Sequence, residues 1–228
     1  MTEVALQTFY DRFFAALEAA GIPVVILGGQ AMLRHRIAET TKDADLCVRP
    51  AHFAGFLREL ERTRYFETAP VYRRVISAPL AQPWAAAGWG AHFEFPVPGG
   101  LRPRIDVLAR PPRIDPADLP AGGVAPLFLL AETKKTRREA KDWGQVATLG
   151  HFLLDAGDVR GLLLLQDEDE LRERLPDFAR DERLIAQRPN LRLAWERNER
   201  LGAALETERR FWRMLDAARW NVFEEASR

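Results

Sequence analysis

The sequence of 228 residues has a single cysteine, no net charge and no long apolar run. With Cys47 alone, no disulfide can form within the chain, and its apolar neighbours predict a small, buried side chain. Lysine plus arginine and aspartate plus glutamate both number 33, so no basic field covers the whole surface to attract nucleic acid. The leucine run from Leu162 to Leu165 is far shorter than the roughly 20 apolar residues that cross a bilayer. Because the N-terminal segment suits an amphipathic helix and not a signal peptide, we expect a soluble, cytoplasmic protein.

Two common catalytic patterns are also missing. The histidines lack the paired or helical spacing of a zinc site and lie at His35, His52, His92 and His151. No Gly-x-Ser-x-Gly sequence is present, and one buried cysteine gives little support to a thiol nucleophile. The hydrophobic content of 47% is ample for a folded core, in one large domain or two small ones.

The first half of the chain alternates between helical and extended patterns. Apolar residues recur at helical spacing until Gly21-Ile22-Pro23 interrupts them, and Pro50 stands where the first turn of another helix tolerates a missing N–H. A turn rich in proline and glycine at residues 96–100 makes the runs on either side antiparallel neighbours. These patterns predict helices over residues 3–20 and 51–63, a helix starting near Gln30, and strands at 24–27, around Asp43 and Asp45, at 71–76, 91–95 and 104–109.

Prolines and glycines break up residues 111–126, which makes this stretch the best candidate for a domain boundary. Beyond it, apolar residues return at helical spacing from Leu127 to Leu215. We therefore predict an α+β fold with a small mixed sheet flanked by helices over residues 1–115, followed by a C-terminal helical bundle over residues 124–228.

Three short segments carry the residues from which chemistry is expected. They are Val24-Val25-Ile26-Leu27-Gly28-Gly29-Gln30, Thr41-Lys42-Asp43-Ala44-Asp45-Leu46 and Arg104-Ile105-Asp106-Val107-Leu108. Residues two apart on a strand project to the same face, so Asp43 and Asp45 project together, away from the core. Two adjacent carboxylates repel one another unless a cation or a proton lies between them, and a hard divalent ion such as Mg²⁺ suits them.

This arrangement resembles the minimal nucleotidyltransferase superfamily, which has the DNA polymerase β-like fold. In that family Gly-Gly starts a short helix, Asp-x-Asp lies on the next strand, and a third carboxylate lies on a later one. The stretch from Gly28 to Leu46 is most similar to the bacterial branch that includes abortive-infection (AbiEii-type) toxins and small uncharacterised relatives, and the likeness spans roughly residues 20–150. Asp-x-Asp alone is a weak motif, because metal-dependent glycosyltransferases also use it. Its combination with the upstream glycines and the downstream Asp106 carries the resemblance.

The resemblance implies a role for each of these residues. Asp43, Asp45 and Asp106 are expected to be the catalytic carboxylates and to bind Mg²⁺, or Mn²⁺ in its place. Backbone N–H groups after the glycines are expected to hold nucleotide phosphates, and a helix from Leu127 is expected to place Lys134, Arg138 and Lys141 on one face toward them. The expected nucleotide-binding residues are therefore Gly28, Gly29, Lys42, Lys134 and Lys141.

Each assignment has a plainer alternative. The glycines can form a strand-ending turn for geometry alone, and the aspartate pair can be a solvated strand end. Glu94, on the neighbouring strand, can substitute for Asp106. The basic stripe can be an ordinary solvated face balanced by acidic neighbours, and Trp84 and Trp89 can be packing residues and not a platform for a base.

The chain departs from the family at two positions. Relatives often place an arginine four residues before the first metal aspartate, where this chain has Glu39. Arg34 or Arg36 would then have to compensate if nucleotide affinity and selectivity are to be kept. Where relatives often have a further aspartate three residues after the Lys-Asp pair, this chain has Gln145.

Our expectation is a metal-dependent nucleotidyltransferase that moves NMP from an NTP such as ATP to a hydroxyl of RNA (a tRNA end), a protein or a small molecule such as an aminoglycoside. The resemblance also implies a toxin that acts with a cognate antitoxin. A non-catalytic nucleotidyltransferase-like module that binds nucleotide or a protein partner is the alternative. A glycosyltransferase is a third hypothesis, but it expects a longer nucleotide-binding sheet than the roughly forty residues before Asp43 provide.

Overall fold

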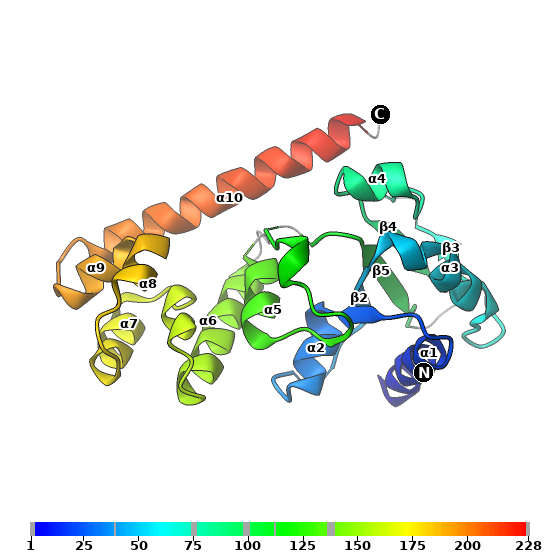
Figure 1. Ribbon diagram of the computed structural model, residues 1–228, viewed down its shortest axis with the longest axis horizontal. Coiled ribbons are helices and arrows are strands. Elements are labelled where there is room, and N and C mark those ends of the chain that lie inside the picture. The colour runs from blue at the N-terminus through cyan, green and yellow to red at the C-terminus, as the bar shows by residue number, and fades with distance from the viewer. Residues whose placement is uncertain are drawn as a thin grey trace. The chain divides into compact units, whose positions relative to one another are not determined.

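The computed structural model describes residues 3–38, 40–73, 77–97, 101–111, 113–135 and 140–226. The chain forms two compact units, which meet in sequence at Ala125 and Pro126 (Figure 1). The first holds a mixed sheet with flanking helices and the second is helical, so the α+β class is confirmed. Across the described residues, no helix has the length and apolar character needed to cross a membrane.

Six strands of the first unit form one mixed sheet in the order β3-β4-β5-β2-β1-β6. Their bounds are β1 Val24–Ile26, β2 Asp43–Val48, β3 Val71–Tyr72, β4 Ala91–Glu94, β5 Arg104–Leu108 and β6 Gly123–Val124. β2 is parallel to β5 and antiparallel to β1, while β4 is antiparallel to β5, as the turn at residues 96–100 predicted. The edge strands β3 and β6 pair with β4 and β1.

Two features of this sheet differ from the sequence prediction. β6 was not predicted, because a two-residue strand is too short to show a periodic pattern. Its pairing with β1 carries the first unit past the expected boundary at residue 115. The strand expected at 71–76 is described only for Val71 and Tyr72, and residues 74–76 lie outside the described residues.

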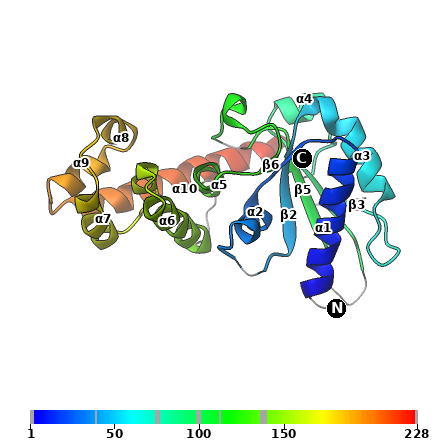
Figure 2. The ribbon, with the colours of Figure 1, turned by 60° about the horizontal axis from the view of Figure 1, so that its bottom comes forward.

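An aromatic layer from the helices covers one face of the sheet. The helices of this unit are α1 Glu3–Ala19, α2 Gly28–Arg34, α3 Phe53–Arg62 and α4 Gln82–Ala86, with 3-10 turns η1 at Pro50–His52 and η2 at Pro116–Asp118. Figure 2 shows α1 running beside β2 and β5. Phe9 of α1 packs edge-to-face on Phe95 with ring centroids 4.9 Å apart, and Phe13 meets Phe56 of α3 at 5.8 Å. On this face of the sheet, the strands β2 and β5 contribute four fully buried residues, which are Ala44, Leu46, Ile105 and Val107.

Tyr10 of α1 links the starts of β2 and β5. Its buried hydroxyl accepts a hydrogen bond from Arg104 N at 3.0 Å and donates to Lys42 O at 2.9 Å. Burial raises the pKa of this phenol, the hydrogen bond from Arg104 opposes the shift, and three nearby carboxylates add to it. Those carboxylates belong to Asp43, Asp106 and Asp45.

Removal of this hydroxyl tests its structural role. We expect Tyr10→Phe to lower the free energy of unfolding by about 1–3 kcal/mol, because the N–H of Arg104 loses this acceptor and the carbonyl of Lys42 loses this donor. Tyr72→Phe is the control, since its side chain is half exposed and its hydroxyl accepts a long hydrogen bond from Leu80 N at 3.5 Å. Chemical denaturation should show a change below about 0.5 kcal/mol for the control. Equal losses in the two variants would contradict the linking role of Tyr10.

The buried role predicted for Cys47 is confirmed. Its side chain is buried on β2, and the thiol lies 3.4 Å from Ala109 O, to which it donates. Burial raises the pKa of the thiol to about 12, with a smaller opposing effect from Arg49. Cys47 is therefore a neutral packing residue at physiological pH.

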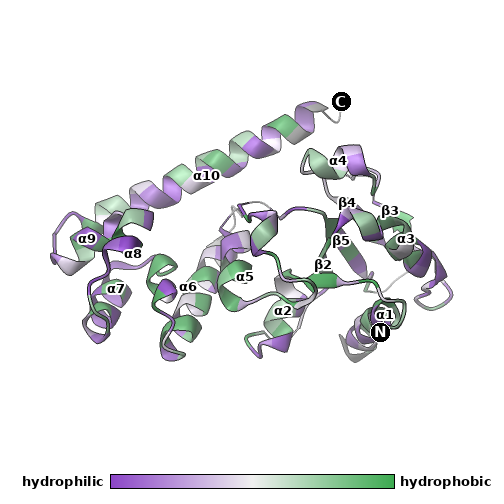
Figure 3. Ribbon diagram, in the orientation of Figure 1, coloured by the Kyte–Doolittle hydropathy of each residue, from purple (hydrophilic) through white to green (hydrophobic). Residues whose placement is uncertain are grey.

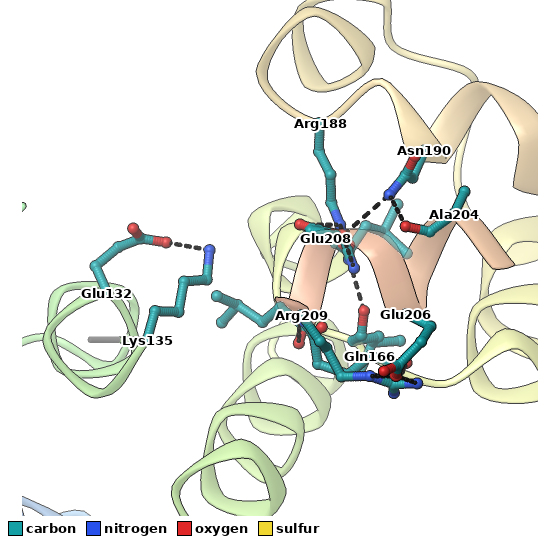
Figure 4. Close-up of polar contacts among 12 residues, drawn as sticks. Glu132, Lys135, Gln166, Arg188, Asn190, Ala204, Glu206, Glu208 and Arg209 are labelled. Atoms are coloured by element: carbon teal, nitrogen blue, oxygen red, sulfur yellow. Dashed lines mark hydrogen bonds and ion pairs between the residues drawn. The ribbon is translucent and has the colours of Figure 1, made fainter. Parts of the chain in front are cut away.

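The second unit is helical, as expected. Its helices are α5 Leu127–Lys134, α6 Ala140–Asp155, α7 Glu168–Arg174, α8 Glu182–Gln187, α9 Asn190–Trp195 and α10 Leu201–Ala226, with 3-10 turns η3 at Val159–Leu163 and η4 at Leu175–Asp177. Leucines dominate its core, among them Leu162, Leu165, Leu171 and Leu191. Arg188 is buried beside this core and binds the carboxylate of Glu208 on α10 (Figure 4).

Candidate active site

β2 and β5 bring the three expected carboxylates together on the polar face of the sheet. In the parallel pairing Asp45 is the register partner of Asp106, and Asp43 lies two residues earlier beside Arg104. Ala44, between the two aspartates of β2, is fully buried against the aromatic layer. Because side chains alternate along a strand, the three aspartates share the opposite face.

The glycine turn lies directly against this face. Gly28 has a φ of +54°, in the left-handed region that favours glycine, and a Cβ there would overlap Asp45 Oδ2. A Cβ on Gly29 would overlap Thr41 Oγ1. Both glycines are therefore needed for the close approach of the backbone to the carboxylate strand. The helix α2 begins at Gly28, slightly earlier than the predicted start near Gln30.

Because of this close approach, a methyl group added at Gly28 should destabilise the folded state. We expect Gly28→Ala to lower the free energy of unfolding by about 1–3 kcal/mol, since alanine is strained at positive φ and its Cβ displaces the Asp45 carboxylate. Gly144→Ala on α6 is the matched control, because a Cβ there meets nothing within 4 Å. That control should gain about 0.4–1 kcal/mol in chemical denaturation. A neutral or stabilising Gly28→Ala would show that the turn does not require glycine.

Asp43 is positioned by the residue two before it. Thr41 Oγ1 lies 3.2 Å from Asp43 Oδ1 and 3.2 Å from Asp43 O, so its single proton is shared between two acceptors. Lys42, between them, has an exposed side chain and accepts the Tyr10 hydroxyl at its carbonyl. The ammonium of Lys42 is thus accessible at the start of the carboxylate strand.

Asp106 is flanked by two basic side chains. Its Oδ1 atom lies 2.8 Å from His92 Nδ1 and 3.8 Å from Arg73 Nη1. The short contact has the distance of an ion pair but not the geometry of a hydrogen bond. Within the described residues, neither Asp106 Oδ1 nor His92 Nδ1 has a hydrogen-bond partner, although both atoms are buried. Asp106 Oδ1 therefore keeps the capacity to accept a further donor or a cation.

Sequence reasoning missed His92. The antiparallel register places His92 opposite Asp106, and places Glu94 opposite Arg104. The two-residue rhythm at 91–95 already put His92 and Glu94 on one face, which is the signal that was available. The register across the turn selects His92, and not Glu94, as the neighbour of Asp106.

The two lysines expected in the second unit lie on different helices. The prediction of one helix carrying Lys134, Arg138 and Lys141 is wrong, because α5 ends at Lys134 and α6 starts at Ala140. Thr133 Oγ1 donates to Leu130 O at 2.7 Å, and such side-chain bonds compete with the continuing helix. Lys134 Nζ donates to Gln145 Oε1 at 2.6 Å. Arg138 and the side chain of Lys141 lie outside the described residues.

Neither arginine proposed to compensate for Glu39 is shown near the carboxylates. Arg34 binds Asp11 of α1 at 3.1 Å and lies 4.8 Å from the ring centroid of Phe14. Arg36 is exposed in a turn at a φ of +60°. Glu39 itself lies outside the described residues.

Among the described residues, no three His, Cys, Asp or Glu side chains are grouped closely enough to hold a metal ion as they stand. The tryptophans named in the sequence, Trp84 and Trp89, pack edge-to-face with ring centroids 5.9 Å apart.

No protein-family model, curated protein or solved structure matches the chain.

Proposed function

We propose that the chain is a metal-dependent nucleotidyltransferase of the DNA polymerase β-like kind, which transfers NMP from an NTP to a hydroxyl. The observation that carries this proposal is the pairing of Asp45 with Asp106 across β2 and β5, with Asp43 on the same face and Gly28 against Asp45. Like charges are costly to place side by side, so a fold that does so next to a glycine turn favours a cationic ligand at this point.

The chemistry of the donor set suits Mg²⁺, or Mn²⁺ in its place, and the three side chains would have to draw closer together to bind it. Asp43, Asp45 and Asp106 offer only carboxylate oxygens, which hard divalent ions prefer. The charges of all three raise the pKa of Tyr10, so their fields combine within this part of the sheet. A bound divalent ion would neutralise phosphate charge and lower the pKa of the attacking hydroxyl.

The chain's own residues would position the nucleotide around that ion. Gly28 and Gly29 let the backbone approach Asp45 and Thr41 more closely than any residue with a Cβ could, and the N–H groups that follow them at the start of α2 would hold phosphate. Thr41 orients Asp43, while His92 and Arg73 hold Asp106. Lys42, whose side chain is exposed just before β2, would contact phosphate. The nucleotide-binding role of Lys134 and Lys141 remains a proposal from the sequence resemblance.

The remaining question is the acceptor of the NMP group, which is RNA, a protein or a small molecule such as an aminoglycoside. The test is incubation of the purified chain with each labelled NTP and Mg²⁺, together with total RNA, protein lysate or aminoglycoside in parallel. We expect label in one acceptor class, release of pyrophosphate, and loss of both on chelation. If the labelled acceptor were essential for growth, the chain would act as the toxin of a toxin-antitoxin pair.

A non-catalytic nucleotide-binding module is the second candidate. The contacts of Asp106 favour it, because a carboxylate that already lies beside the Arg73 guanidinium and the His92 ring is less available to a metal. It predicts metal-dependent NTP binding without transfer to any acceptor. The glycosyltransferase hypothesis required a longer sheet before the motif, and within the described residues only β1 precedes β2.

A further inference from the structure

The last helix, α10, carries apolar side chains on two faces. Leu201 and Leu205 are buried in the core of the second unit. A separate stripe is exposed, with exposed fractions of 53% for Phe211, 70% for Met214, 46% for Leu215 and 63% for Val222. These four residues follow helical spacing and form one face. Figure 3 shows the alternation of hydrophobic and hydrophilic residues along α10.

The exposed stripe is distinct from the face that packs in its own unit. At 100° per residue, the stripe is centred roughly 100° around the helix from Leu201 and Leu205. Single exposed apolar residues are ordinary, but a contiguous row of large ones marks an interaction surface. The stripe therefore calls for a partner whose chemistry the rest of the helix can indicate.

Charge is distributed unevenly along the same helix. Glu206 binds three arginines at 2.9–3.3 Å, so the first half of α10 keeps a positive excess. The arginines are Arg209, Arg210 and Arg213. The last turns carry Glu224 and Glu225 instead. A helix that is positive in its first half and negative at its end is complementary to a second copy that runs in the opposite direction.

We propose that two copies of this chain associate through the exposed stripes of α10, packed antiparallel about a twofold axis. With the axis midway between Phe211 and Val222, each of these residues faces the other across the pair, and Leu215 faces Ala218. The small side chain of Ala218 leaves room for Leu215 of the other copy, which allows close packing. The arginines of one helix approach the terminal glutamates of the other.

The alternatives to this arrangement fit less well. A parallel pair would place the arginine cluster of one helix against the same cluster of the other, and like charges across an interface are unfavourable. A twofold pair needs one surface that complements itself, and the antiparallel stripe has this property. The contact is small, below about 1,200 Å² in total, so we expect a dimer that dissociates in the micromolar range.

The first test is the oligomeric state of the full chain by sedimentation velocity over the micromolar range. We expect a monomer–dimer equilibrium, and dimerisation at least about tenfold weaker in Phe211→Glu plus Met214→Glu. Phe152→Glu on α6 is the matched control, because Phe152 is also an exposed aromatic, at 43%, but lies outside the stripe. The control should dimerise like the native chain.

Charge exchange tests the direction of the helices. Arg210→Glu plus Arg213→Glu, and separately Glu224→Arg plus Glu225→Arg, should each weaken the dimer. The variant with all four changes should regain it, because the two halves become complementary again with opposite signs. Circular dichroism of each variant shows whether α10 stays helical.

Three results would overturn the proposal. The first is a native chain that stays monomeric at every concentration. The second is a fourfold variant, still helical, that fails to dimerise. The third is a stripe variant that loses thermal stability but dimerises like the native chain, which would show that the stripe is covered by the same chain.

Discussion

Replacement of Asp43 and Asp45 together by alanine is expected to lower nucleotide transfer by at least about 1000-fold. Both carboxylates lie on the polar face of β2, and removing them leaves Asp106 as the only one of the three aspartates. Stabilisation of phosphoryl charge by a metal accounts for several kcal/mol of barrier, and each 1.36 kcal/mol changes the rate about tenfold. The measurement is transfer of labelled NMP to the acceptor at saturating NTP.

A control variant separates this loss from a general effect of removing two acidic residues. Glu59→Ala plus Glu61→Ala removes two carboxylates with the same spacing from α3, which packs on α1 behind the sheet. This variant should transfer label like the native chain. Because the repulsion between Asp43 and Asp45 is also removed, we expect the alanine pair to remain folded. Equal transfer by the alanine pair and the native chain would remove the two aspartates from the mechanism.

Arg188→Met is expected to lower the free energy of unfolding of the second unit by about 3–5 kcal/mol. The Arg188 side chain is buried, donates to Leu162 O at 2.9 Å and Leu165 O at 2.6 Å, and binds Glu208 Oε2 at 2.9 Å through Nη2. Asn190 also donates to Glu208 (Figure 4). Methionine fills similar volume but satisfies none of these acceptors, so two carbonyls lose the Arg188 donor and the Glu208 carboxylate loses its buried cation.

A surface ion pair provides the comparison. Arg180 binds Glu182 at 2.8 Å, but the two side chains are 45% and 65% exposed. Exposed pairs contribute about 0–1 kcal/mol, so Arg180→Met should change chemical denaturation little. If Arg188→Met were no more destabilising than Arg180→Met, the buried network would not hold α10 to the preceding helices.

The parts of the fold that the sequence predicted are those with strong local periodicity. The helix at 3–20 and the strands at 91–95 and 104–109 each repeat apolar residues at the spacing of their element, and each is present. The strand β6 was missed because it depends on pairing with β1, which no local pattern reveals. The sequence predicted one helix from Leu127 past Lys141, but α5 ends at Lys134. The prediction ran too far because the spacing of the residues is helical both before Lys134 and after Ala140.

The candidate site was predictable to a similar extent. That Asp43 and Asp45 share one face of the sheet follows from the alternation of side chains along a strand. That Asp106 lies beside them follows from the order of the three segments, which pairs β5 with β2. The contacts of Asp106 with His92 and Arg73 were not predictable, because they depend on the register of two antiparallel pairs. Register is set by turn geometry, which the sequence of the turn does not fix uniquely.

Binding of Mn²⁺, measured by electron paramagnetic resonance with and without NTP, tests the central claim most directly. The native chain should bind the ion in the presence of NTP, and Asp43→Asn plus Asp45→Asn should bind it at least about tenfold more weakly than the native chain. The account predicts that Glu59→Ala plus Glu61→Ala binds it like the native chain. Equal Mn²⁺ binding by the asparagine variant and the native chain would contradict the assignment of this face of the sheet as the metal and nucleotide site.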